Sequence, residues 1–315
     1  MGIQLTKNPV LNQKISLRKE IVRNEAQKSR ISVNAARVVF VLDHSGSMRG
    51  MYRDGTVQDV LERIFPVAMY FDDNAEMEFY WFDSGFRELE PVNYDTIEDY
   101  VQREILSKKE HFGGTNYAPV MQEILTRYVK RDPAEIPTFV IFITDGNNAD
   151  KAATKAVLTE ASHFNLFWKF IGIGNEEFAF LQRLDDLKGR LIDNANFISV
   201  KDLSAISDES LYAMLLEEYA DWLVLCKENG IPVEAACCDP VQDIRSIVSA
   251  AIPGCILQEE ATSDMLKIHI YYPDNRKFGI VKISRPGGTL QLRKLAGGAP
   301  QNFDLSGTED LIKFI

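Results

Sequence analysis

One short stretch, residues 37–48, constrains the fold of this chain more than any other. It reads RVVFVLDHSGSM, in which a run of apolar and β-branched residues ends at Asp43 and a polar loop with Ser45 and Ser47 follows. An apolar run that is too short for a lone helix predicts a strand buried on both faces, as in a parallel sheet. The loop would then lie at the carboxyl end of the strand, where open α/β sheets bind their ligands.

Two later stretches carry oxygen-bearing side chains in a similar context. Residues 112–117 read FGGTNY, which places Thr115 after a glycine pair and before a helical pattern. Residues 139–146 read FVIFITDG, a second apolar strand that delivers Asp145 at its carboxyl end. Because a parallel sheet gathers the carboxyl ends of its strands at one edge, we expect the three loops to meet there.

These loops supply five side chains that form a candidate metal site: Asp43, Ser45, Ser47, Thr115 and Asp145. Carboxylate and hydroxyl oxygens are hard ligands that suit Mg²⁺, with Mn²⁺ or Ca²⁺ as alternatives, far better than zinc or copper. Taken alone, the D-x-S-x-S pattern also fits an Asp and two serines that cap the following helix. The agreement of all three loops favours a site for one divalent cation.

This pattern resembles the metal-ion-dependent adhesion site of the von Willebrand factor A (VWA) family, which consists of D-x-S-x-S, a distant Thr and a distant Asp. All five positions are filled here in the family's order. Beyond the site, the stretches GTVQDVLERIFPVAMYFDDNAEMEFYWFD and FGGTNYAPV resemble the VWA domain of bacterial tellurium-resistance proteins of the TerF type. The resemblance covers about residues 30–230.

The resemblance implies a function as well as a fold. In the VWA family the ion keeps one coordination position open, and a Glu or Asp carboxylate of a partner protein fills it. By analogy, Asp43, Ser45 and Ser47 would bind the ion directly. Thr115 would bind it directly or through water, and Asp145 would contact the other ligands. The implied protein is a scaffold or adaptor of a tellurium- or stress-resistance system that binds a partner carboxylate and is not an enzyme.

A metal-dependent phosphoester hydrolase is the main alternative, in which the cation activates water. That chemistry needs a general base and usually a second cation or a cationic group. Arg49 and Arg53 follow the first loop closely, but no lysine or arginine occupies a motif position. The chain also lacks the G-x-x-x-x-G-K-[ST] sequence of P-loop enzymes. The residues therefore favour a binding module over an enzyme.

Charge and secondary-structure patterns divide the chain into three parts. Strands that alternate with helices predict a doubly wound, mostly parallel α/β sheet flanked by helices, the VWA domain, over residues 35–230. Residues 240–315 offer one helix, then three strand-like runs separated by turns, and a final helix over residues 307–314, which predicts a small α+β domain with an antiparallel sheet. Residues 1–34 contain two short alternating pieces, IQLTK and KISLRKEIV, and are predicted to form an N-terminal arm or a short hairpin.

The net charge of −11 at pH 7 disfavours non-specific binding of the whole protein to nucleic acid or to an anionic membrane. From Thr262 onward, however, eight Lys or Arg face five acidic residues. This excess allows a third hypothesis, an adaptor whose C-terminal domain contacts nucleic acid. An ordinary solvated face explains the same residues and is favoured.

The chain is expected to be cytoplasmic. No hydrophobic segment follows Met1, and no apolar run approaches the roughly 18 to 20 residues that a membrane span needs. The four cysteines show no C-x-x-C spacing, which predicts free thiols in a reducing compartment.

Overall fold

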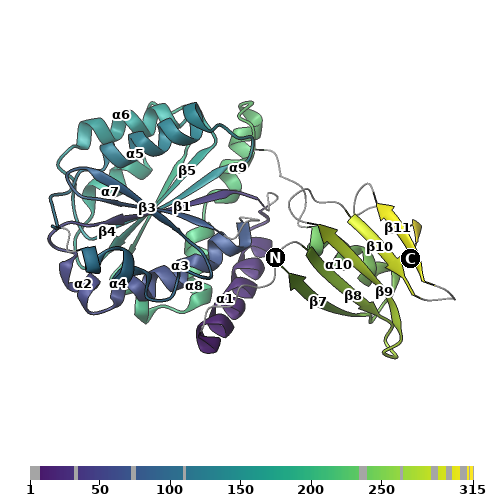
Figure 1. Ribbon diagram of the computed structural model, residues 1–315. Coiled ribbons are helices and arrows are strands. Elements are labelled where there is room, and N and C mark those ends of the chain that lie inside the picture. The colour runs from purple at the N-terminus through teal and green to yellow at the C-terminus, as the bar shows by residue number, and fades with distance from the viewer. Residues whose placement is uncertain are drawn as a thin grey trace. The chain divides into compact units, whose positions relative to one another are not determined.

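The computed structural model describes residues 8–31, 35–71, 76–108, 111–233, 240–262, 265–284, 290–295, 300–305, 311 and 313–314. These residues form two compact units, an α/β unit and a smaller α+β unit that follows it in the chain (Figure 1). The predicted fold class, a mostly parallel sheet flanked by helices plus a small C-terminal α+β domain, is confirmed.

The first unit is built on a six-stranded sheet. Its strands are β1 (Arg37–Asp43), β2 (Met77–Phe82), β3 (Phe86–Val92), β4 (Thr138–Thr144), β5 (Leu166–Ile173) and β6 (Ala195–Val200). They lie in the order β3-β2-β1-β4-β5-β6, and all neighbours are parallel except β2 and β3. The connections change direction between β1 and β4, which is the point where a doubly wound sheet places its ligand.

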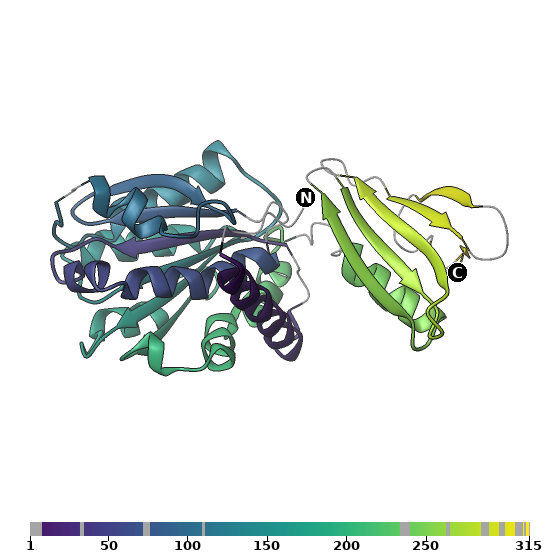
Figure 2. The same cartoon turned by 60° about the horizontal axis from the view of Figure 1, so that its bottom comes forward.

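Helices flank this sheet on both faces (Figures 1 and 2). They are α1 (Pro9–Lys28), α2 (Arg49–Arg53), α3 (Thr56–Phe71), α4 (Tyr100–Glu104), α5 (Ala118–Leu125), α6 (Lys151–Ala161), α7 (Ala179–Asp185), α8 (Asp208–Leu216) and α9 (Tyr219–Glu228), with the short turns η1 (Leu106–Lys108), η2 (Thr126–Arg131) and η3 (Leu203–Ala205). One apolar core includes α1, α3, α8 and α9, and another includes α5, α6 and α7.

The two cores explain the uninterrupted apolar sequence of β1. Val38, Phe40 and Leu42 belong to the core of α1, α3, α8 and α9. Val39 and Val41 point to the opposite face and belong to the core of α5, α6 and α7. A strand that is buried on both faces has no solvent-facing position to fill with a polar residue, so its sequence does not alternate.

The prediction of an arm or hairpin for residues 1–34 is wrong where the structure describes them. Residues 9–28 form the single helix α1, whose start is capped by the Asn8 side chain, with Pro9 in the first turn. Its buried apolar residues are Leu11, Ile15, Val22 and Ala26. These positions recur at helical spacing and pack against α3 and α8, so tertiary contacts override the short alternation of KISLRKEIV. The other predicted piece, residues 3–7, lies outside the described residues.

Strand β5 carries a fully buried lysine. The Nζ atom of Lys169 donates to the side-chain oxygen of Asn196 and, at 3.3 Å, to the backbone carbonyl of Glu217. Both acceptors are neutral, and burial lowers the pKa of Lys169 from its ordinary value of 10.5 to about 8.

Replacing Lys169 by methionine is expected to remove part of the pH dependence of stability. Between pH 8 and 10.5 the unfolded chain binds a proton at this lysine that the folded chain does not bind. The free energy of unfolding therefore rises with pH across this interval, by up to about 3 kcal/mol, and the slope ends below about pH 8, where both states are charged. Urea denaturation of both proteins over this interval measures the difference. The exposed Lys188→Met is the control, and an unchanged slope in Lys169→Met would contradict the interpretation.

The second unit is an antiparallel sheet with one long helix. Its elements are α10 (Pro240–Ala251), β7 (Ile256–Thr262), β8 (Met265–Tyr271), β9 (Lys277–Ser284), β10 (Leu290–Lys294) and β11 (Gln301–Leu305). The strands lie in the order β11-β10-β9-β8-β7, and Ile244 and Val248 of α10 belong to the same core as alternate residues of β8. The sequence predicted three of these strands. It missed β7 and β11, which are edge strands with few apolar residues.

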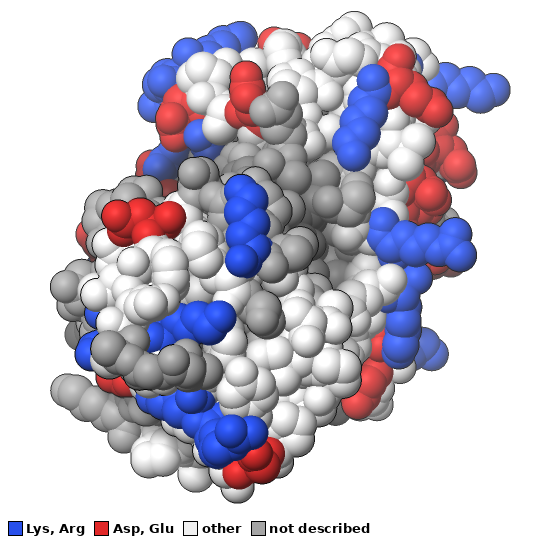
Figure 3. Space-filling model, turned by 90° about the vertical axis from the view of Figure 1, so that its right-hand side faces the viewer, with Lys and Arg blue, Asp and Glu red and all other residues white. Residues whose placement is uncertain are grey.

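On the face shown in Figure 3, the lysine and arginine side chains of the described residues are scattered and not gathered in one area. Several of these residues have acidic partners. Lys267 and His269 each lie 3.0 Å from Glu260, and Arg276 lies 2.7 Å from Asp274. These pairs reduce the charge available for phosphate groups, and contact with nucleic acid stays a prediction.

Two further expectations concern helices and thiols. None of the helices in the described part of the chain is both long enough and apolar enough to cross a membrane.

Cys226 and Cys255 are free thiols, as expected. Cys237 and Cys238 lie outside the described residues.

Candidate metal centre

The three predicted loops meet at the carboxyl ends of β1 and β4. Ser45 forms an isolated parallel bridge with Gly113, and the backbone N–H of Gly46 donates to the Gly113 carbonyl at 3.1 Å. The loop after β4 joins them, because the Ala149 N–H donates to the Thr115 carbonyl at 2.9 Å. The backbone therefore ties all three loops together at the switch point of the sheet.

Four of the five predicted side chains form one continuous chain of hydrogen bonds. The Ser45 N–H donates to Oδ1 of Asp43 at 2.7 Å, and the hydroxyl oxygens of Ser45 and Ser47 are 3.0 Å apart. The Ser47 hydroxyl then donates to Oδ1 of Asp145 at 2.8 Å. The ends of β1 and β4 thus direct two carboxylates and two hydroxyls to the same place.

Thr115 belongs to this arrangement through its loop. Its side chain is half-buried, and the hydrogen bond that the structure gives it, among the described residues, uses its backbone carbonyl. The structure thus brings four predicted residues together through their side chains and the fifth through its backbone.

The two carboxylates lie in an unfavourable environment for negative charge. Asp43 is 0% exposed, and burial raises its pKa to about 6, although hydrogen bonds from Thr144 and Ser45 act in the opposite direction. Burial also raises the pKa of Asp145. Within the described residues, neither carboxylate forms an ion pair with a lysine, arginine or histidine. A fully buried carboxylate such as Asp43 is normally paired with a positive group or binds a metal, so this place, with the half-buried Asp145 beside it, is suited to a cation.

The spacing and chemistry of the oxygens fit a small divalent cation. Mg²⁺ takes oxygen ligands at about 2.0–2.1 Å in an octahedron, whose neighbouring ligands are about 3 Å apart. The hydroxyl oxygens of Ser45 and Ser47, which are both proposed ligands, are 3.0 Å apart. The described residues contain no group of three or more His, Cys, Asp or Glu that could hold a metal. The candidate set instead combines two carboxylates with three hydroxyls.

Sequence reasoning missed a buried threonine that supports Asp43. The Thr144 hydroxyl donates to Oδ2 of Asp43 at 2.6 Å, and the Tyr117 hydroxyl lies 3.2 Å from Thr144 Oγ1 and donates to the Gly146 carbonyl at 2.6 Å. The Tyr52 hydroxyl donates to the Asp43 carbonyl at 2.9 Å. These contacts hold the Asp43 carboxylate in one orientation. Thr144 could have been found as the polar residue that ends an otherwise apolar strand, next to Asp145.

Asp150 is a second missed residue. It joins the loop after β4 to the loop that carries Thr115, residues 112–117, which is called the threonine loop below. Its carboxylate accepts hydrogen bonds from the backbone N–H groups of Tyr117, at 3.0 Å, and Ala118, at 2.8 Å, where α5 begins. The side chain of Asn148 donates to it at 2.7 Å. From the sequence, an acid directly before α6 would be expected to cap that helix. It instead caps α5, which the chain reaches through Thr115.

His44 directly follows Asp43 in the sequence but is not one of the candidate metal ligands. Its ring stacks on Phe112, with ring centroids 4.1 Å apart, and contacts Trp81 at 4.4 Å. Burial lowers the pKa of His44 to about 4. The aromatic contacts make the residue after Asp43 a packing element between the first two loops.

Gly113→Ala is expected to destabilise the threonine loop. A Cβ atom at this position would clash with Oδ2 of Asp83 and lie 2.8 Å from its Cγ. Asp83 cannot withdraw freely, because its Oδ1 accepts the Gly85 N–H at 2.8 Å. We expect a loss of about 1–3 kcal/mol in the free energy of unfolding, measured by urea denaturation. In Gly146→Ala, where nothing lies within 4 Å of the added atom, the loss should be smaller. Equal losses in the two variants would contradict the close approach.

The chain is similar to a known protein family, to a curated protein and to a solved structure. Residues 35–232 match the family vWA-TerF-like, described as the vWA domain found in the TerF C terminus. The protein YcbR of Bacillus subtilis (strain 168), itself uncharacterized, is 42% identical over 219 residues, which are 69% of this chain and 89% of YcbR. Among solved structures, proximal thread matrix protein 1 from the mussel byssus aligns with a TM-score of 0.46 and 14% identity.

The extent of these matches differs. The alignment with the byssus protein covers 60% of this chain and 49% of the other, so this chain spans about half of that protein's length. The family match spans more than half of this chain and contains all five residues of the candidate metal centre. The chain therefore belongs to the vWA-TerF-like family.

Proposed function

We propose that this protein is a protein-binding module that depends on one divalent cation, Mg²⁺ in the first instance, and that engages a carboxylate of its partner. The observation that carries the proposal is the environment of Asp43. This carboxylate is fully buried, has no cationic partner among the described residues and begins a chain of oxygens that ends at Asp145. Such a set is suited to a hard cation.

Each residue of the centre has a distinct part in this proposal. Asp43, Ser45 and Ser47 would hold the cation, and Thr115 would contact it directly or through water. Asp145 would orient the Ser47 hydroxyl, to which it is already hydrogen-bonded. When bound, the cation supplies positive charge. Because Asp145 would act only through Ser47, the two carboxylates would not fully screen that charge, and the cation would attract a further anionic oxygen.

Membership of the vWA-TerF-like family supports a proposal about cellular context. From the relationship to the TerF C terminus we infer a role in a tellurium- or stress-resistance system. We propose that it serves there as a scaffold or adaptor. Its partner would be recognised through one carboxylate, with the surrounding contacts providing specificity.

Isothermal titration of Mg²⁺, Mn²⁺ and Ca²⁺ into the 315-residue chain tests the proposal. We expect one cation to bind per chain. A phosphatase assay with p-nitrophenyl phosphate on the same samples should show no metal-dependent turnover. If no cation binds, the proposed function is wrong. Turnover that requires the cation would instead identify a metal-dependent hydrolase.

A further inference from the structure

A pocket of about 560 Å³ adjoins the candidate metal centre. Its size falls within the roughly 300–1,000 Å³ that is usual for ligand sites. Its walls come from α2, from α4 with the turn η1, and from His111 and Phe112 in front of the threonine loop. Two of its lining residues lie next to loops of the metal centre in the sequence. Arg49 follows Ser47 by two residues, and Phe112 precedes Thr115 by three.

The pocket is cationic in a protein that is acidic overall. Arg49 and Arg53, one helical turn apart on α2, line it together with His111, and no acidic residue is among its described lining. In the described part of the chain, neither guanidinium forms an ion pair, although Arg49 lies over the Phe112 ring at 5.2 Å. Two arginines without carboxylate partners are suited to bind an anionic group with paired oxygens.

One residue that lines this pocket also carries a buried polar atom without a partner among the described residues. His44, which is 1% exposed, lines it, and its Nδ1 atom has no hydrogen-bond partner among the described residues. Buried polar atoms are rarely left without a partner unless a ligand or water provides one. Because Phe112 already stacks on His44 and lies beneath Arg49, the pocket offers polar and charged contacts rather than a free aromatic face.

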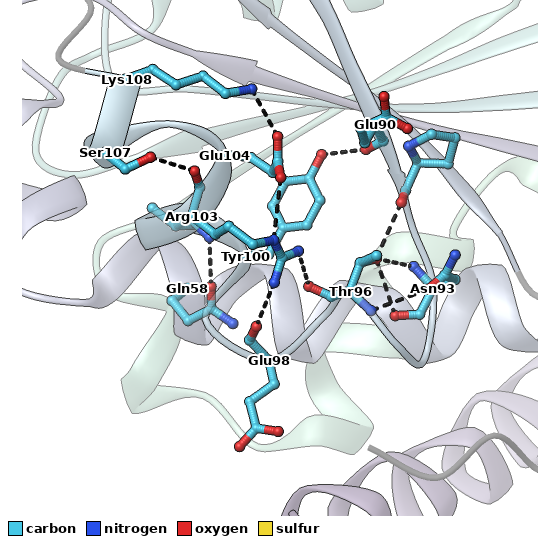
Figure 4. A network of polar contacts seen from close by, with 12 residues as sticks. Gln58, Glu90, Asn93, Thr96, Glu98, Tyr100, Arg103, Glu104, Ser107 and Lys108 are labelled. Atoms are coloured by element: carbon cyan, nitrogen blue, oxygen red, sulfur yellow. Dashed lines mark hydrogen bonds and ion pairs between the residues drawn. The ribbon is translucent and has the colours of Figure 1, made fainter. Parts of the chain in front are cut away.

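The opposite wall of the pocket is held in place by its own polar network (Figure 4). The guanidinium of Arg103 donates to the Thr96 carbonyl at 2.8 Å and to the Glu98 carbonyl at 3.2 Å, and it pairs with Glu104. Lys108 pairs with Glu104 at 2.8 Å. The charged side chains of α4 and η1 are therefore engaged with one another, and α4 contributes the neutral Gln102 to the pocket. The positive charge of the pocket is not cancelled from this side.

We propose that this pocket binds a second carboxylate of the same partner segment, so that the partner is an acidic peptide with two acidic residues. The inference rests on the proposed function, because the first carboxylate is the one at the metal centre. The Cα atoms of Ser47 and Arg49 are at most about 7 Å apart, and an extended peptide advances about 3.3 Å per residue. The two acidic residues are therefore expected about two positions apart, and up to four where the long arginine side chains reach further along the peptide.

Fluorescence anisotropy with synthetic peptides tests this inference. The probes are fluorescein-labelled glycine–serine peptides with two glutamates separated by one, two or three residues. Each has a matched peptide in which one glutamate is glutamine. With Mg²⁺, at least one two-glutamate peptide should bind about tenfold more tightly than its match, since hydrogen bonds between charged groups are among the stronger ones. The double variant Arg49→Gln/Arg53→Gln should lose this preference but keep Mg²⁺-dependent binding of the one-glutamate peptide.

Arg183→Gln/Lys188→Gln is the matched control, because it removes the same charge from exposed positions outside the pocket and should keep the preference. Equal binding of the paired peptides to the unmodified protein would overturn the inference. A preference that survives in Arg49→Gln/Arg53→Gln would also overturn it. If the preference depends on the arginines but no binding depends on Mg²⁺, the pocket is supported and the metal-dependent function is not.

Discussion

Asp43→Asn is expected to abolish Mg²⁺ binding, with a loss in affinity of at least about 100-fold measured by isothermal titration. Loss of a group that only orients a metal ligand typically costs 10–100-fold, and Asp43 is proposed to hold the cation itself. The fold should remain. Asparagine can accept the Ser45 N–H and can donate to Thr144, so the contacts that Asp43 makes at 2.7 and 2.6 Å are retained.

Measurements of stability show whether Asp43→Asn loses only a metal ligand or also loses the fold. Burial disfavours the Asp43 charge, so asparagine should not lower the free energy of unfolding of the metal-free protein. Mg²⁺ should raise the melting temperature of the unmodified protein and not that of Asp43→Asn. The exposed Asp186→Asn is the control. Asp145→Asn should weaken binding less, by about tenfold, because Asp145 is proposed to act through Ser47. Unchanged affinity in both site variants would contradict the assignment.

Asp150→Ala is expected to lower the free energy of unfolding by about 4 kcal/mol. The Asp150 carboxylate accepts two backbone N–H groups at the start of α5, and each hydrogen bond to a charged group contributes about 1.5–3 kcal/mol. Alanine leaves those donors and the Asn148 side chain without this acceptor. Urea denaturation measures the loss, and Mg²⁺ affinity should fall with it because Thr115 lies on the loop that Asp150 holds.

Asp150→Asn should show an intermediate loss, since it keeps one acceptor oxygen without the charge. The exposed Asp186→Ala, which removes an acid at the end of α7, should stay within about 0.5 kcal/mol of the unmodified protein. A loss in Asp150→Ala no larger than that of Asp186→Ala would show that these hydrogen bonds contribute little.

The strands and the helix that position the metal centre were predictable because the apolar pattern of each is visible in its own sequence. β1 and β4 have no polar residue in their central positions, and α3 carries its apolar residues at helical spacing from Thr56 to Phe71. Helix α1 and the edge strands β7 and β11 were not predictable in the same way. Their sequences are largely polar, and contacts with distant elements decide their conformation.

The candidate site shows the same division. Asp43, Ser45 and Asp145 lie at strand ends, so their meeting follows from the parallel sheet. The parts of Thr144 and Asp150 depend on hydrogen bonds across about 30 to 100 residues of sequence, which no local pattern encodes. The pocket lined by Arg49 and Arg53 could not be predicted, because helix α4 forms its other wall and no local pattern in the sequence gives the position of α4 relative to α2.

Helix α1 has a consequence for what counts as one domain. The family match begins at residue 35, but the apolar core that contains β1 also contains Leu11, Ile15 and Val22. Arg18 of α1 and Arg63 of α3 share the carboxylate of Asp208 on α8, at 2.9 and 2.7 Å. A fragment cut at residue 35 would therefore expose apolar surface and remove one of the two cations that hold Asp208. The segment that the family match covers is shorter than the unit that folds, and a fragment chosen for expression should begin before Asn8.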